Sequence, residues 1–105
     1  MFEGLKDMGK LVKQAKDMKS KMKKIQDELK TLEVTGEAPG FQVVMSGELD
    51  VIRIRINPDA VKEGNAGKLE KSAVQAFNDA AKKAKNLATT RLSALSGDFN
   101  IPGLG

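Results

Sequence analysis

The first third of the chain carries apolar residues at alternating steps of three and four. They are Met8, Leu11, Ala15, Met18, Met22, Ile25, Leu29 and Leu32. On an α-helix this spacing places them in one stripe, and it matches a heptad seam kept for about three and a half repeats. The pattern predicts a helix over residues 5–32, roughly 40–45 Å long. Because a compact domain of about 100 residues has a radius of gyration near 13 Å, we expect this helix to overhang its own domain.

The middle third changes to a period of two. After a short β-like piece at residues 33–37, Pro39 and Gly40 mark a turn. In residues 41–46, Phe41, Val43 and Met45 alternate with Gln42, Val44 and Ser46, and in residues 49–56 three isoleucines alternate with two arginines. Asn57-Pro58 ends the second run, since proline cannot donate to a β-ladder. Residues 33–56 are therefore predicted to form an antiparallel meander of about three strands.

The last third returns to a helical pattern. A polar connection over residues 59–67 leads into a second long helix at about residues 68–95, whose apolar positions are mostly alanine. Alanine lets a neighbouring element approach closely. Residues 97–105 show no period and are expected to be a flexible tail. The order long helix, meander, long helix predicts a single α+β domain over residues 1–96.

Such a small sheet leaves its edges exposed and one face poorly covered. Exposed edges invite pairing with another chain. Pairing of two copies would cover both the edges and the face. We therefore expect a tweezer-like homodimer, with the sheets forming a central body and the helix pairs projecting as arms.

The net charge of +4 is concentrated in two places. Seven lysines lie between residues 10 and 24 against the single acid Asp17, and a second cluster occurs late in the chain. The two groups are Lys10, Lys13, Lys16, Lys19, Lys21, Lys23 and Lys24, and then Lys82, Lys83, Lys85 and Arg91. Two basic helical stretches are the footprint of a polyanion binder, and the alternative is a solvated face that only aids solubility. Arg53 and Arg55 either extend this basic surface onto the sheet or pair with acids across the meander.

Several kinds of chemistry are disfavoured by the residues present. Without cysteine or histidine there are no thiolate or imidazole ligands and no Ser-His or Cys-His nucleophile. Glu48 and Asp50 are expected to be solvated turn residues. The Gly-x-x-Gly-Lys segment at residues 64–68 lacks the spacing and the Ser or Thr of a phosphate-binding loop. We therefore expect no enzyme activity, no cofactor or metal, and no small-molecule substrate.

The start of the chain lacks a secretion signal and no apolar run is long enough to span a membrane, so the expected location is cytoplasmic. The type of nucleic acid follows from what accompanies the lysines. Tryptophan and tyrosine are absent, and the four phenylalanines are not interleaved with the basic positions, which disfavours stacking on single strands. Lysine point charges along a straight helix suit the phosphates of double-stranded DNA and carry little sequence information.

Five stretches in this order resemble the YbaB/EbfC family of bacterial nucleoid-associated proteins. They are residues 18–29 (MKSKMKKIQDEL), 32–38 (LEVTGEA), 43–47 (VVMSG), 56–58 (INP) and 76–80 (AFNDA). The resemblance implies a tweezer-shaped homodimer that binds DNA in the nucleoid and acts in chromosome organisation and gene expression. The family's basic helix positions correspond here to Lys10, Lys13, Lys16, Lys19, Lys23 and Lys24, and further to Lys82, Lys83 and Arg91.

Two other functions fit the same pattern. The chain could be a protein-interaction module that uses the apolar seam of the first helix, in which case the lysines only solubilise it. It could also be an amphipathic helix at a membrane surface, which the scarcity of Trp, Leu and Phe on the apolar face disfavours.

Overall fold

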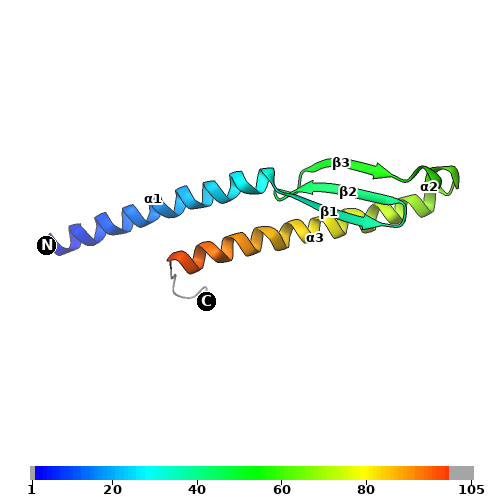
Figure 1. Ribbon diagram of the computed structural model, residues 1–105. Coiled ribbons are helices and arrows are strands. Elements are labelled where there is room, and N and C mark those ends of the chain that lie inside the picture. The colour runs from blue at the N-terminus through cyan, green and yellow to red at the C-terminus, as the bar shows by residue number, and fades with distance from the viewer. Residues whose placement is uncertain (1, 100–105) are drawn as a thin grey trace.

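The computed structural model describes the backbone of residues 2–99 and the side chains of residues 8–95. The elements follow in the order α1 (Phe2–Thr31), β1 (Glu33–Ala38), β2 (Phe41–Ser46), β3 (Val51–Ile56), α2 (Pro58–Lys62) and α3 (Ala66–Phe99). The molecule is a rod of 76 × 23 × 16 Å with a radius of gyration of 20.9 Å. The α+β prediction is confirmed, and α1 does extend beyond the rest of the chain (Figure 1).

The core lies where α3 crosses the sheet. Ala76, Ala80 and Ala84 are completely buried, and the side chains of Val43 and Met45 on β2 pack against them. Four-residue spacing keeps the three alanines on one face of the helix. With only a methyl group at each position, the backbone of α3 comes close to β1 and β2, as the alanine-rich pattern predicted.

The closest approach is at Gly36 on β1. A Cβ atom built at this position would lie 2.0 Å from the carbonyl oxygen of Ala76 and 2.5 Å from the backbone nitrogen of Ala80. No side chain fits there. Gly36 therefore sets how tightly the sheet rests on α3.

The sheet is antiparallel with the order β1-β2-β3. Val43 pairs with Ile54 and Phe41 with Ile56, so these two isoleucines share the sheet face on which α3 packs. They are nevertheless 44% exposed, because α3 makes its contacts with β1 and β2. The outer strand thus leaves an apolar surface uncovered, which we call the β3 face: Val51, Ile52, Ile54 and Ile56.

Several boundaries differ from those predicted, beginning with α1, which spans Phe2–Thr31 instead of residues 5–32. The expected connection after β3 contains the one-turn helix α2, which Asn57 caps by accepting a hydrogen bond from the backbone N–H of Asp59 at 2.9 Å. β3 begins at Val51 instead of residue 49, and α3 runs from Ala66 to Phe99 instead of about 68–95. Residues 97–99, expected in the tail, therefore continue the helix, and the remainder of that expected tail lies outside the described residues.

Candidate nucleic-acid interface

The lysines of α1 spread over the half of the helix that faces away from its apolar stripe. Lys16, Lys19 and Lys23 each directly follow a stripe residue and lie about 100° from it. Successive residues turn by about 100° around a helix, so residues two apart lie about 160° from each other. Lys10, Lys13 and Lys24 each stand two residues from a member of the stripe. The full set, called the basic face, is Lys10, Lys13, Lys16, Lys19, Lys23 and Lys24, all exposed.

None of the six lysines of the basic face is tied up in an ion pair within the part of the chain whose side chains are described. Asp27, at the sheet end of the helix, pairs with Lys30 instead, at 3.9 Å. Six ammonium groups on one side of a straight helix therefore remain available to a polyanion.

The sheet holds the C-terminal end of α1 in place. The backbone N–H of Gly47 is shared between the carbonyl oxygens of Leu29, at 2.9 Å, and Leu32, at 3.1 Å. The side chain of Leu29 is buried, and a Cβ atom at residue 47 would lie 2.8 Å from its Cδ2. These contacts fix the direction in which the basic face points.

Lys83 on α3 is engaged within the chain. Its Nζ lies 3.2 Å from Oδ2 of Asp79 and donates to the carbonyl oxygen of Thr35 at 2.8 Å. The same Asp79 oxygen accepts the backbone N–H of Glu37 at 3.2 Å. That backbone hydrogen bond, and then the contact with Lys83, lower the pKa of the Asp79 carboxyl. Lys83 and Asp79 thus fasten α3 to β1.

Arg91 joins the two long helices. Its Nη1 lies 3.8 Å from Oε2 of Glu28 on α1. Both residues line a groove between α1 and α3, together with Ile25 and Leu95. Arg91 therefore helps to hold α1 against α3, and its charge is partly offset.

The other two predicted residues on α3 point away from the core. Lys82 lies about 160° around the helix from buried Ala80, and Lys85 about 180° from buried Ala76. Both are exposed. The structure thus divides the ten predicted residues into the basic face of α1, the outward pair Lys82 and Lys85, and the internally paired Lys83 and Arg91.

On the sheet, Arg53 forms an ion pair and Arg55 is exposed. Nη2 of Arg53 on β3 lies 3.3 Å from Oε2 of Glu33 on β1. Because Arg53 is opposite Val44 of β2, this ion pair crosses the middle strand on the side away from α3. The pairing alternative holds for Arg53.

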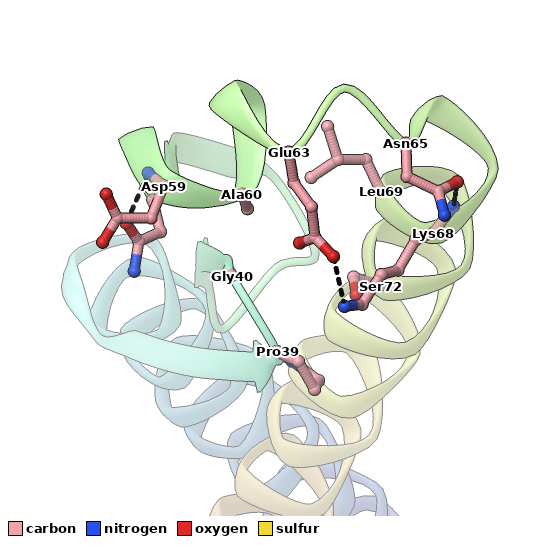
Figure 2. A pocket seen from close by; sticks show the side chains of 10 residues that line it. Pro39, Gly40, Asp59, Ala60, Glu63, Asn65, Lys68, Leu69 and Ser72 are labelled. Atoms are coloured by element: carbon pink, nitrogen blue, oxygen red, sulfur yellow. Dashed lines mark hydrogen bonds and ion pairs between the residues drawn. The ribbon is translucent and has the colours of Figure 1, made fainter.

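A pocket of about 200 Å³ lies at the end of the rod opposite the N-terminus of α1, where α2 meets the start of α3. Figure 2 shows the ion pair between Lys68 and Glu63, 3.0 Å, at this pocket. Oδ1 of Asn65 accepts the backbone N–H of Lys68 at 3.1 Å, which caps α3. The Gly-x-x-Gly-Lys segment therefore starts a helix and lies far from the basic face.

Sequence reasoning missed α2 and this pocket, although the Asn-Pro-Asp signal for α2 was present. A polar cap followed by proline and an acid is typical of a helix start.

Comparison with known proteins decides the family. The YbaB/EbfC DNA-binding family model matches residues 4–99, which include every element after the first residues of α1. The chain belongs to this family. The relatives of this chain are named as nucleoid-associated proteins.

Two of the relatives are nucleoid-associated proteins of Thermoanaerobacter pseudethanolicus and Caldanaerobacter subterraneus. Each is 33% identical over an alignment of 105 residues that covers 98% of this chain and 95% of the relative. A third, from Afipia carboxidovorans, is 38% identical over 97 residues, covering 90% of this chain and 92% of its own. The resemblance noted from the five sequence stretches is confirmed. Among the described residues, no helix has the length and apolar character needed to cross a bilayer.

Proposed function

We propose that the protein is a nucleoid-associated protein that binds duplex DNA through phosphate contacts of the basic face of α1. The observation that carries the proposal is the set of six exposed lysines on one side of α1 with no acidic partner among residues 8–95. Lys82 and Lys85 offer two further exposed ammonium groups on α3. Membership of a DNA-binding family and the names of the relatives support DNA as the polyanion.

The mode of binding follows from the side chains. Lysine ammonium groups are point charges, and they lack the paired donors with which Arg, Asn or Gln read base edges. Binding is therefore largely independent of sequence and arises from release of counterions from the phosphates. Such binding suits a role in chromosome organisation and gene regulation, at the nucleoid in the cytoplasm.

The protein acts as a homodimer in this proposal. The β3 face lies on an edge strand of the sheet and consists of four large, exposed apolar side chains. A second copy placed against this face would bury them. A dimer joined at the sheets carries two α1 helices away from a central body, so two basic faces engage DNA together.

Salt-dependent binding tests the phosphate contacts. Six to ten such contacts lower the affinity a thousandfold or more between about 50 and 200 mM salt. In the double variant Lys16→Gln, Lys23→Gln, the slope of log K against log salt should fall by about 2 for each α1 that contacts DNA. Fluorescence anisotropy with a labelled duplex measures both quantities.

The matched control removes the same charge from the far end of the rod. Lys62→Gln, Lys71→Gln changes two exposed lysines near α2, and the slope should stay within error of the unmodified protein. Equal slopes for both double variants, or binding that does not weaken with salt, would contradict the proposal. That outcome would favour the alternative in which the lysines only solubilise an interaction module.

A further inference from the structure

The apolar stripe of α1 is more exposed at its N-terminal end than at the end that meets the sheet. Leu29 is 7% exposed and Met22 40%, whereas Leu11 and Met8 are both 63% exposed. The buried end is covered by α3, whose Ala94 and Leu95 line a groove with Ile25. The exposed end extends past α3 (Figure 1). The apolar stripe of α1 therefore packs against α3 at one end, and at the other end no helix among the described residues covers it.

This exposed section is self-complementary. We call it the arm seam: Met8, Leu11, Ala15, Met18 and Met22. In an antiparallel pair of such helices centred on Ala15, Met8 lies opposite Met22 and Leu11 lies near Met18. The small alanine at the centre lets the two axes approach closely, and a two-fold pair of this kind uses the same surface on both copies. The occupant that best fits the spacing is a second copy of α1.

The arm seam and the basic face occupy different halves of α1, and three of the six lysines lie almost opposite the seam. Lys10, Lys13 and Lys24 lie about 160° around the helix from Met8, Leu11 and Met22, respectively. A duplex held on the lysines therefore leaves the arm seam facing away from the DNA. Two α1 helices that pair through their arm seams would each still present lysines outward.

Charge decides when the arms can meet. Without DNA, two α1 helices bring the twelve lysines of two basic faces, none of them in an ion pair, within a few helix diameters, and their repulsion opposes pairing. Phosphates bound to each basic face remove that repulsion. Pairing therefore depends on DNA.

We propose that arms of different dimers pair through the arm seam once each is bound to DNA, so that the protein holds two duplexes together. This inference rests on the proposed DNA binding and extends it from binding one duplex to bridging two. The seam joins the proteins, and the opposite faces of the joined helices hold one duplex each.

A capture experiment tests the bridging. One duplex is fixed to beads, the protein is added, and retention of a second, labelled duplex is measured. The double variant Met8→Gln, Leu11→Gln replaces two well-exposed apolar side chains without changing charge. Its capture of the second duplex should fall tenfold or more, while its affinity for a single dilute duplex changes by less than twofold.

Val12→Gln is the matched control. Val12 is on the same helix, next to Leu11 in sequence, and is 54% exposed, but it lies outside the arm seam. Its capture of the second duplex should stay within twofold of the unmodified protein. An equal loss in the control and in the seam variant would overturn the inference.

Cross-linking locates the contact directly. The chain has no cysteine, so Ala15→Cys introduces a single thiol at the centre of the seam. Under mild oxidation, disulfide-linked chains should increase at least tenfold when duplex DNA is present. Equal cross-linking without DNA would assign the seam to the free dimer and overturn the inference.

The outcomes separate the two proposals. Binding of a single duplex without capture of a second, or unchanged capture by the seam variant, overturns the bridging and leaves the proposed DNA binding intact. Absence of single-duplex binding by the unmodified protein overturns both.

Discussion

At the scale of single residues, the packing of the sheet on α3 depends on Gly36 having no side chain. In Gly36→Ala the new methyl group would meet the backbone of α3 at Ala76 and Ala80, which cannot yield as a flexible side chain can. We expect a loss of about 3 kcal/mol in the free energy of unfolding, measured by urea denaturation. Strand β1 must move off α3 to accommodate the change.

Gly9 provides the opposite case on α1. Nothing lies within 4 Å of a Cβ atom built there, and the residue is inside a helix. Gly9→Ala should therefore stabilise the helix by roughly 0.5–1 kcal/mol. Similar effects of the two alanine substitutions would contradict the close packing at Gly36.

Asp79 makes the attachment of α3 to β1 sensitive to acid. The N–H of Glu37 and the ammonium of Lys83 hold the folded-state pKa of its carboxyl below the ordinary value of 3.8. A group with a lowered folded pKa stabilises the fold above its unfolded pKa, and that contribution is lost as the pH falls through the folded pKa. Asp79→Asn should therefore be less stable than the unmodified protein near pH 7, and the difference should shrink below about pH 4.

Urea titrations between pH 3 and 7 measure this difference. Glu70→Gln, which removes an exposed carboxylate from the same helix, is the control for the loss of one negative charge. A constant difference between Asp79→Asn and the unmodified protein over the whole range would show that the charge of Asp79 does not contribute.

At the scale of elements, the sequence predicted the parts whose periodicity is long and uninterrupted. The heptad stripe of α1, the alternation of β2 and β3, and the alanines of α3 each repeat often enough to fix the type of element. The length of α1 also predicted its overhang. The short helix α2 was missed because one turn contains no repeat, although Asn57, Pro58 and Asp59 carry its start signal.

The partners of the basic residues could be predicted only in part. Asp79 and Lys83 are four apart, so their ion pair can be expected on a helix. The bond from Lys83 to the carbonyl of Thr35 joins residues 48 positions apart, and the pair of Arg91 with Glu28 depends on how α1 and α3 meet. These contacts depend on tertiary packing, which a one-dimensional pattern does not contain. The lysines of α1 required no such knowledge, since helical spacing alone places them on one side.

At the scale of the whole molecule, the β3 face determines the proposed assembly. Ile54→Lys puts a charge in the middle of that face, and we expect the dimer to dissociate into monomers at micromolar concentration in sedimentation experiments. Since a monomer has one α1 instead of two, its apparent affinity for a long duplex should fall at least tenfold.

Val61→Lys serves as the control because Val61 is an exposed apolar residue on α2, 55% exposed, and is not part of the β3 face. It should sediment like the unmodified protein. A dimer that survives Ile54→Lys would place the interface elsewhere on the rod.

The position of the long helices' free ends along the rod has a practical consequence for labelling. The N-terminus of α1 and the end of α3 both lie toward one end of the molecule, whereas α2 lies at the other (Figure 1). A fluorescent protein fused to either terminus would stand beside the surface proposed to touch DNA and would crowd it. A dye attached through Val61→Cys in this cysteine-free chain would sit at the remote end and follow the protein in cells without that obstruction.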